Sequence, residues 1–290
     1  MKWRMFICAI CFLIGGCSLN IPLEDQFSDP DAITDVLSAR SLLASAYKAM
    51  PQQIFQLSVL SDDFCPSQHL NKDMSLQGLY NWREVEMTEL AGTLWAGYYA
   101  VIAEVNALLA RIDAVVTLDE TEKLEKMRIV CEAKALKSWC YFDLLRLFAP
   151  RYEGNENKDG IILKKRVELD FLPRSSVKEC VTEIRTLLNE ARNVDNTQKN
   201  VYWLSDKAVA YLQVELELYA GNYPAVLELT KDLETEYPES VLGADVYKYL
   251  WSSENSDARI FGKYQLEQIY MDIRFDTFEK GDYLVLSQNV

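Results

Sequence analysis

Hydrophobic side chains recur every three or four positions through two long segments of the chain. In the first, a helix predicted to open at Thr88, the apolar positions are Leu94, Trp95, Tyr98, Ile102, Val105, Leu108, Leu109 and Ile112. This spacing places them on one face of an α-helix. The second helix is predicted to start at a capping box of Thr117 and Glu120 and to run to about Phe148, where Pro150 stops it. The two helices are expected to form an antiparallel hairpin.

Further start signals divide the rest of the chain into shorter helices. The predicted helices are 29–50 behind Asp29-Pro30, 176–192 behind Ser176 with Glu179, 205–221 behind Ser205, and one that begins at Asn222-Tyr223-Pro224. The stretch LYAGNYPAVLELTKDLE has the short turn and paired helices of a tetratricopeptide unit. Strand signals are few, at 259–264 and 283–286. The predicted fold class is mainly α, with tetratricopeptide-like helix hairpins stacked as an α-α superhelix, long irregular loops and little strand.

Several segments show no helical period. Residues 18–28 are interpreted as a tether, and the helical domain is predicted to cover 29–265. Within it, 51–86 and 151–173 are predicted loops, and loops of this length are functional more often than plain connectors. Residues 51–86 are therefore the first place to expect a binding surface. The apolar run in GDYLVLSQNV has no visible partner, so 266–290 is interpreted as an incomplete C-terminal segment.

The N-terminus has the pattern of an exported, lipid-modified protein. Lys2 and Arg4 precede the apolar run Met5–Ile14, which is far shorter than the roughly 20 residues that span a bilayer, so 1–16 is predicted to be a signal peptide. Ile14-Gly15-Gly16-Cys17 has the apolar, small, small, Cys order of a bacterial lipobox. Cys17 would be lipidated and become the first mature residue, anchored by two or more acyl chains. The alternative is a plain secreted protein in which Cys17 stands there by chance.

The charge balance narrows the class of partner. Acidic residues outnumber basic ones 44 to 30, a net charge of -14, and loss of Lys2 and Arg4 with the signal peptide changes this to -16. Nucleic acid and anionic lipid surfaces are unfavourable partners for such a chain, whereas a neutral or cationic ligand remains open.

The cysteines and the single histidine limit the chemistry. Cys65, Cys131, Cys140 and Cys180 remain after the signal peptide and Cys17 are set aside, and buried free thiols are preferred over disulfides. Since His69 is the only histidine and no cysteine pair has zinc spacing, we expect no metal and no cofactor. The G-x-S-x-G, P-loop and G-x-G-x-x-G motifs are absent from the sequence. The chain is predicted not to be an enzyme.

The best candidate binding residues lie in 51–86. Sugar binding needs flat aromatic faces against C–H groups and amide or carboxylate groups for hydroxyls. Tyr80, Asn81 and Trp82 offer both types, with Trp82 as the stacking ring, although Trp82 could instead pack onto the helix hairpin. Asp62 and Asp63 could bind a hydroxyl, or could be a helix cap or a solvated turn. They could also serve an anchored glycosidase, which would need paired carboxylates about 5 to 10 Å apart in a cleft.

Other aromatic residues are expected to be structural. Tyr202 and Trp203 precede the Ser205 cap and are predicted to staple that helix to the core. Four more lie on periodic helices and are predicted to belong to the core: Trp95, Tyr99, Trp139 and Tyr141.

Five segments in order resemble one protein family. Trp95, Tyr99, Ile102 and Asn106 stand at the spacing W-x3-Y-x2-I-x3-N. EAKALKSWCYFDLLRLFA, residues 132–149, is similar to a helix with E-A-x2-L-x4-Y-F-x-L-x-R. The other three segments are Pro173-Arg174-Ser175-Ser176, LYAGNYPAVLEL and ENSDARIF. Together with the lipobox, they make the chain resemble the SusD/RagB nutrient-uptake lipoproteins of bacterial outer membranes.

The resemblance implies a function as well as a fold. Such proteins are lipid-anchored to the outer membrane, face the cell exterior, bind an oligosaccharide or similar nutrient without catalysis, and act as the lid of a SusC-like TonB-dependent transporter. The resemblance covers about residues 17–265, while typical members are longer, so the chain could be a short variant, a truncated gene product or a fragment. The alternatives are a tetratricopeptide-like scaffold lipoprotein that binds a protein partner, or a non-functional remnant.

Overall fold

The structure is a computed structural model that describes residues 33–66, 74–168, 171–192, 202–236, Ile260 and 284–286. All of these residues belong to one unit, Ile33–Val290. The predicted signal peptide, Cys17, the tether and the Asp29-Pro30 helix start lie outside the described residues, as does most of the strand predicted at 259–264.

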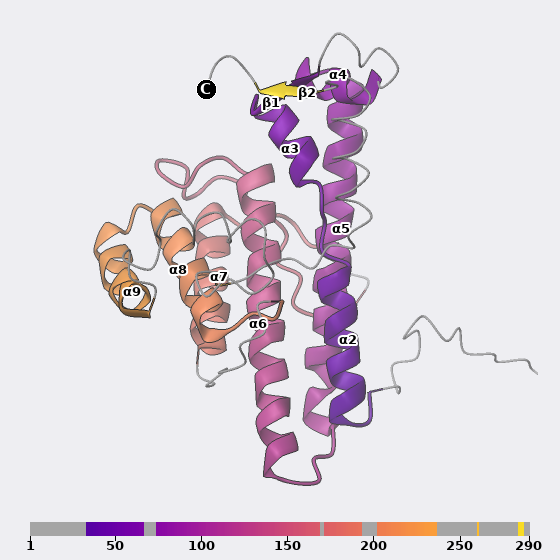
Figure 1. The fold of residues 1–290 in the computed structure, drawn as a ribbon, viewed down its shortest axis with the longest axis vertical. Coiled ribbons are helices and arrows are strands. Elements are labelled where there is room, and N and C mark those ends of the chain that lie inside the picture. The colour runs from indigo at the N-terminus through magenta and orange to yellow at the C-terminus, as the bar shows by residue number, and fades with distance from the viewer. Residues whose placement is uncertain are drawn as a thin grey trace, which may run out of the picture. The chain divides into compact units, whose positions relative to one another are not determined.

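Two long antiparallel helices lie at the centre of this unit (Figure 1). α5 spans Glu84–Arg111 and continues into a short 3-10 turn, η2, at Ile112–Ala114; α6 spans Glu120–Phe148. The predicted hairpin is therefore confirmed, and α6 ends two residues before Pro150 as expected.

Both helices of this hairpin begin at residues other than those predicted. α5 starts at Glu84 instead of Thr88, because the chain turns sharply just before it and the extended Arg83 leads directly into the helix. The cap of α6 is Asp119, whose side chain accepts a hydrogen bond from the backbone N–H of Glu122 at 2.8 Å. The predicted cap at Thr117 is wrong, since an aspartate two residues later caps a helix at least as well.

α2, Val36–Lys48, packs against both α5 and α6. Its N-terminus is a capping box in which the Asp35 carboxylate accepts from the Ser38 backbone N–H at 2.7 Å and the Asp35 backbone N–H donates to the Ser38 hydroxyl at 3.2 Å. Residues 33–35 are not helical, so the predicted helix does not run without a break from Pro30 to Met50, and α2 begins only at Val36. In this capping box the side chains of Asp35 and Ser38 each accept a hydrogen bond from the other residue's backbone N–H, which stabilises a helix that starts directly after Asp35.

The remaining helices stack in chain order beside α6: α7 at Val177–Ala191, α8 at Asp206–Tyr219 and α9 at Tyr223–Glu236 (Figure 1). Ser176 and Glu179 form the predicted capping box of α7. Ser205 caps α8 as predicted, by accepting from the Ala208 N–H at 3.2 Å. The fold class is confirmed as mainly α, built from stacked helix hairpins.

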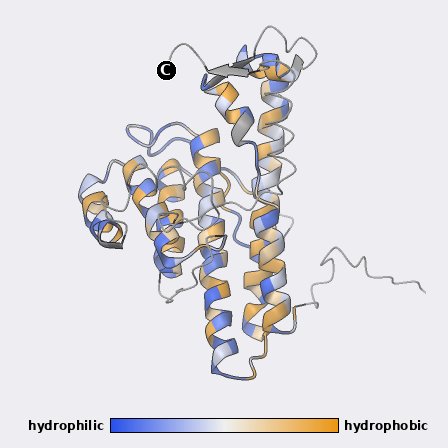
Figure 2. Ribbon diagram, viewed as in Figure 1, coloured by the Kyte–Doolittle hydropathy of each residue, from blue (hydrophilic) through white to orange (hydrophobic). Residues whose placement is uncertain are grey.

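The core runs along the facing sides of α2, α5, α6 and α7. Hydrophobic and hydrophilic residues alternate along α5 and α6, as expected for helices with one buried face (Figure 2). In the part of the chain that the structure describes, one helical segment, Glu84–Ala114, is long and apolar enough to cross a membrane. Its buried residues pack on α2 and α6, which is the behaviour of a core helix.

The segment 51–86 is more ordered than its sequence pattern predicted. It contains α3 at Ile54–Leu60, β1 at Phe64–Pro66 and α4 at Met74–Tyr80. β1 pairs antiparallel with β2, Leu284–Leu286, so the apolar run near the C-terminus has a partner after all. Seven-residue helices are too short for a periodicity argument, and a strand pair more than 200 residues apart leaves no local signal.

Cys131, Cys140 and Cys180 are free thiols, as predicted. Cys140 and Cys180 are buried, and the Cys140 sulfur lies 3.3 Å from the sulfur of Met50. The side chain of Cys65 lies outside the described residues.

Candidate functional site

Two of the predicted ligand residues occupy unusual backbone positions. Among the described residues, the non-glycine residues with positive φ are Asp62, at 66°, and Trp82, at 55°. Aspartate adopts this left-handed conformation fairly often, but a bulky aromatic residue does so rarely. Each stands two residues after the last residue of a short helix, α3 or α4.

The hydrogen bonds identify both positions as Schellman motifs, which end a helix with one left-handed residue. At α4, the N–H of Trp82 donates to the carbonyl of Leu79 at 3.0 Å, and the N–H of Arg83 donates to that of Gly78 at 2.8 Å. At α3, the N–H groups of Asp62 and the next residue make the same two bonds.

α8 ends in the same motif and provides an internal comparison. There the left-handed residue is Gly221, with φ 70°, and the two bonds measure 3.0 and 2.8 Å. Glycine is the usual choice because it has no Cβ to clash. The equivalent position of α4 is occupied by Trp82, which has the largest side chain of all amino acids. The geometry of the turn therefore does not explain why tryptophan stands there.

The predicted site residues differ in exposure. Trp82 is 64% exposed, so it does not pack onto the helix hairpin. Asn81 is exposed, and its amide donates to the carbonyl of Gln77 at 2.7 Å; Tyr80 is half-buried. Asp62 and Asp63 are exposed in a turn, where Asp63 accepts from the Ser61 hydroxyl at 3.0 Å. α3, β1 and α4 contact one another, so the two turns belong to one small subassembly.

A pocket that the sequence analysis missed lies along α5. It has a volume of about 550 Å³ and is lined by Trp95, Tyr99, Ile162, Lys164, Phe171, Leu172 and Pro173. Trp95 and Tyr99 pack against the core as predicted, but only partly, and their remaining surface forms a wall of this pocket. The only signals for it in the sequence are aromatic residues one helical turn apart on α5 and a basic, apolar loop elsewhere.

That loop, residues 160–174, is here named the strap. Side chains of the central hairpin fasten its backbone. The Tyr99 hydroxyl accepts from the N–H of Ile162 and donates to the carbonyl of the same residue, both at 2.9 Å. The carbonyl of Lys164 accepts from the Asn106 amide at 2.9 Å and from the Tyr141 hydroxyl at 2.6 Å. Burial raises the pKa of Tyr99 to about 12, so its hydroxyl stays protonated at neutral pH and can donate.

The far end of the strap is held by Arg174. Its guanidinium donates to the carbonyls of Phe148, at 3.0 Å, and Gly160, at 2.7 Å, and lies 4.9 Å from the ring centroid of Trp95. Trp95, Tyr99 and Asn106, three of the four residues at the W-x3-Y-x2-I-x3-N spacing, therefore share one structural task with Arg174. They hold the strap against the hairpin and shape the pocket between them.

Behind the strap lies a buried polar contact. Lys137 of α6 donates to the Asn106 side-chain oxygen at 2.6 Å, and burial lowers the pKa of Lys137 to about 8. The hydrogen bonds from Tyr99, Asn106 and Tyr141 to the strap backbone are here named the clamp. Because Lys137 holds the Asn106 side chain, it supports the clamp from inside the core.

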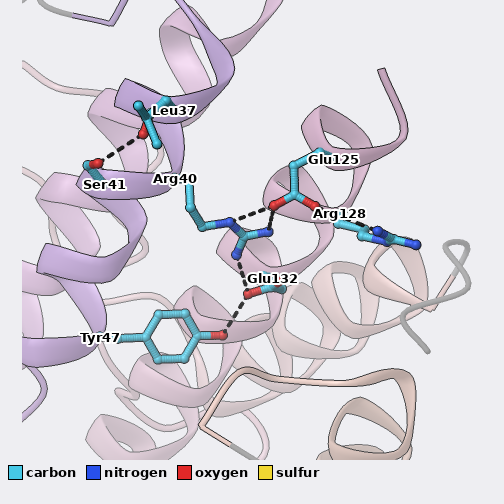
Figure 3. Close-up of polar contacts among 7 residues, drawn as sticks. All are labelled: Leu37, Arg40, Ser41, Tyr47, Glu125, Arg128 and Glu132. Atoms are coloured by element: carbon cyan, nitrogen blue, oxygen red, sulfur yellow. Dashed lines mark hydrogen bonds and ion pairs between the residues drawn. The ribbon is translucent and has the colours of Figure 1, made fainter. Parts of the chain in front are cut away.

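A second buried network joins α2 to α6 (Figure 3). Arg40 donates to Glu132 at 2.9 Å and to Glu125 at 2.8 and 2.5 Å, while the Tyr47 hydroxyl lies 3.5 Å from Glu132. Burial raises the pKa of the Glu132 carboxyl despite the neighbouring guanidinium. The plane of Arg40 also lies 4.7 Å from the ring of Trp203, which packs against Tyr47 as the predicted staple. These groups stabilise the scaffold and are not placed to contact a ligand.

In the described residues, no group of three or more histidine, cysteine or acidic side chains is placed to hold a metal ion.

Comparison with known proteins identifies the family. A SusD-like family model, described as "Starch-binding associating with outer membrane", matches residues 23–215. None of the curated proteins matches the chain.

Solved structures show the same fold. A SusD superfamily protein from Bacteroides thetaiotaomicron matches with a TM-score of 0.71 and 16% identity, over 88% of this chain and 61% of that one. A SusD superfamily protein from Bacteroides fragilis has a TM-score of 0.66 and 20% identity, over 82% and 57%. A laminarin-binding SusD-like protein has a TM-score of 0.58 and 19% identity, over 78% and 50%.

The chain thus spans between half and about three fifths of the length of these proteins. At such identities the structural likeness shows the fold alone, whereas the family model covers well over half of the 290 residues. The chain therefore belongs to the SusD-like family of starch-binding proteins that associate with the outer membrane.

Proposed function

We propose that this protein is a glycan-binding lipoprotein of the cell surface, anchored through Cys17, that delivers nutrient oligosaccharide to a TonB-dependent transporter as its non-catalytic lid. Family membership supports carbohydrate binding and the outer membrane. The binding site of this proposal is formed by Trp82, Asn81 and Tyr80 at the end of α4, with Asp62 and Asp63 at the end of α3.

The observation that supports this site is the exposed, left-handed Trp82. A non-glycine residue in this conformation costs roughly 1–2 kcal/mol, and such strain is concentrated at functional sites. Glycine would satisfy the same turn without that cost, as it does in α8. A large aromatic face held out in water by a rigid helix end is suited to stack on a sugar ring. Asn81 precedes it in the same turn, and Asp62 ends α3, which contacts α4; both carry groups that can bind hydroxyls.

Replacement of Trp82 by glycine tests this site cleanly. Because glycine fits the turn, we expect Trp82→Gly to have an unchanged free energy of unfolding, or one up to about 1 kcal/mol higher. Its affinity for laminarin oligosaccharides, measured by calorimetry, should fall at least about tenfold. The matched control is Tyr223→Ala on α9, where the ring is 65% exposed and should not matter for binding. Parent-like affinity in the glycine variant would disprove this site.

The anchor and the transporter need separate tests. We expect Cys17→Ala to move the protein from the membrane fraction to the soluble fraction, and its retention in membranes would contradict lipidation. A tagged, lipidated protein taken from its native outer membrane in mild detergent should carry a large TonB-dependent barrel in stoichiometric amount. Absence of any barrel in that preparation would contradict the lid role.

A further inference from the structure

We infer that the end of the molecule where α5 turns into α6 is a lipid-docking surface, whose exposed aliphatic side chains enter the interface of a zwitterionic phospholipid layer. This inference rests on the proposed lipid anchor at Cys17 but concerns residues outside the Trp82 site. The end is here named the tip, and it consists of the connection 112–119, Leu37 at the start of α2, and the first two turns of α6.

The three parts of the tip lie at the same end of the helical unit. α5 and α6 are antiparallel, so their connection marks one end of the central hairpin (Figure 1). α2 starts at this end too, because Arg40, one turn after Leu37, donates to Glu125 in the second turn of α6 at 2.8 Å. Further along both helices, the Tyr47 hydroxyl lies beside Glu132, so α2 and α6 run in the same direction from the tip.

The tip exposes aliphatic side chains from all three parts. Leu118 is 84% exposed, Leu37 77% and Val116 65%, and two residues of α6 follow, Leu124 at 49% and Met127 at 46%. Single exposed hydrophobic residues are normal on a protein surface, whereas a group of them at one place marks an interaction site. The aliphatic side chains of the tip would therefore be more stable under a covering layer than in water.

The connection that displays these side chains is braced. Its Val115 side chain is buried in the core. The Lys126 ammonium donates to the carbonyls of Asp113 and Val115, at 3.1 and 2.9 Å, and the N–H of Leu118 donates to the Glu122 carboxylate at 2.7 Å. A surface with a fixed backbone loses less conformational entropy when it docks.

The chain that leads into the tip indicates what covers it. Residues 18–32 separate Cys17 from Ile33, which lies three residues before α2. A segment of this length reaches at most about 55 Å when it is fully extended, so a lipid anchor at Cys17 keeps the tip close to the bilayer. Because the anchor raises the effective concentration of lipid at the tip, a contact too weak to hold the free protein is sufficient. The two contacts together would orient the protein on the membrane.

The charges of the tip favour a zwitterionic lipid over an anionic one. Among the exposed charged residues of 112–123, Asp113, Asp119 and Glu120 are acidic and Lys123 is basic. This excess of carboxylates is repelled by an anionic surface and attracted by the ammonium group of phosphatidylethanolamine. Apolar side chains on such a surface enter the boundary between headgroups and acyl chains by about 5–10 Å.

The test uses the predicted mature chain, residues 18–290, with a hexahistidine tag in place of Cys17. A nickel-chelating lipid holds it on vesicles of phosphatidylcholine and phosphatidylethanolamine, so this anchor works whether or not Cys17 is lipidated in the cell. Thr117→Cys carries an NBD fluorophore, which nitroxide-labelled lipid quenches on contact. Glu228→Cys on α9, beside Leu227 with its 67% exposure, is the matched reporter. The parent, labelled in the same way, measures the signal of its own thiols.

We expect nitroxide lipid to quench the Thr117 reporter and not the Glu228 reporter. Val116→Ser with Leu118→Ser should lower the equilibrium constant for contact of the tip with lipid about tenfold, because less apolar surface then leaves water. Leu227→Ser is the control substitution and should change neither signal. Circular dichroism checks that each variant is folded, which we expect because all three replaced side chains are exposed.

The inference is overturned if the Thr117 reporter is quenched no more than the Glu228 reporter, or if the two serine substitutions leave its quenching unchanged. It is also overturned if vesicles with added phosphatidylglycerol hold the tip more tightly than zwitterionic ones. A Thr117 signal that changes with protein concentration in the absence of vesicles would assign the tip to a second copy of the chain instead of lipid.

Mass spectrometry of the protein from its native membrane separates this outcome from that of the proposed function. Acyl chains on Cys17, without quenching at Thr117, would leave the proposed anchor and remove the docking surface. Quenching at Thr117 in the tagged protein, with no acyl chain on Cys17 in the native one, would leave the docking surface and remove the proposed anchor.

Discussion

Replacement of Arg40 by methionine should be among the most destabilising single changes at the α2–α6 interface (Figure 3). Glu132, its partner, has a side chain that is 1% exposed, whereas the other partner, Glu125, is 25% exposed and can recover water. Loss of Arg40 therefore leaves one buried, unpaired carboxylate. Breaking a buried ion pair in this way costs about 3–5 kcal/mol. We expect that loss in the free energy of unfolding at pH 7, measured by urea titration with circular dichroism.

The pH dependence gives the reasoning a second test. Burial already raises the pKa of Glu132 above its value in the unfolded chain, and removal of Arg40 should raise it further. A group with a raised pKa binds a proton more tightly in the folded state, so the variant gains stability as the pH falls through that pKa. The deficit of Arg40→Met relative to the parent should therefore be smaller at pH 5 than at pH 7.

Two further variants complete the experiment. Arg40→Met with Glu132→Met should be more stable than Arg40→Met alone, because the unpaired charge is gone. Arg128→Met is the matched control, since its contact with Glu125, at 3.7 Å, is solvent-accessible and should contribute less than about 1 kcal/mol. The reasoning is refuted if the double variant loses as much as the sum of the single variants, or if the deficit does not change with pH.

Three further predictions concern the strap and a cap. Between pH 8 and about 10.5 the free energy of unfolding of the parent should rise with pH relative to that of Lys137→Met, because Lys137 holds its proton more tightly in the unfolded chain than in the folded one. Urea midpoints that change equally with pH in both proteins would contradict this. Tyr99→Phe should lower the free energy of unfolding by about 1–3 kcal/mol, because the N–H and the carbonyl of Ile162 both lose their hydrogen bond to the Tyr99 hydroxyl. Hydrogen exchange at Ile162 should become faster, and unchanged exchange would argue against the clamp. Ser176→Ala should cost about 1 kcal/mol in chemical denaturation, through loss of the α7 capping box, and a change below the error of the titration would refute it.

The predicted parts of the fold that the structure confirms are those with local signals. Ser176 with Glu179, and Ser205, start their helices where the sequence placed them, since a cap involves residues only three apart. The predictions for α2 and α6 fail at the start because several nearby residues can cap, and Asp35 and Asp119 are the ones that do. α5 begins without a side-chain cap after the turn that ends α4, which leaves no capping signal in the sequence. Phe148 marks the end of α6 because proline cannot continue a helix.

The candidate site was predicted in part. The sequence located Trp82 and Asp62 by residue type alone, and it left open whether Trp82 packs inward. Its exposure, and the left-handed backbone shared with Asp62, depend on how α3 and α4 end against β1 and α5.

By itself, the sequence determined the helical fold class, the central hairpin and the order of the stacked helices, because hydrophobic period, caps and prolines act within a few residues. Only the tertiary structure decided the pairing of β1 with β2, the buried contact of Arg40 with Glu132 across 92 residues, and the strap pocket, whose clamp joins Tyr99 to Ile162 across 63 residues. Such contacts follow from which surfaces meet when the helices pack. Neither partner carries a local mark of the other, so they become visible only in the folded chain.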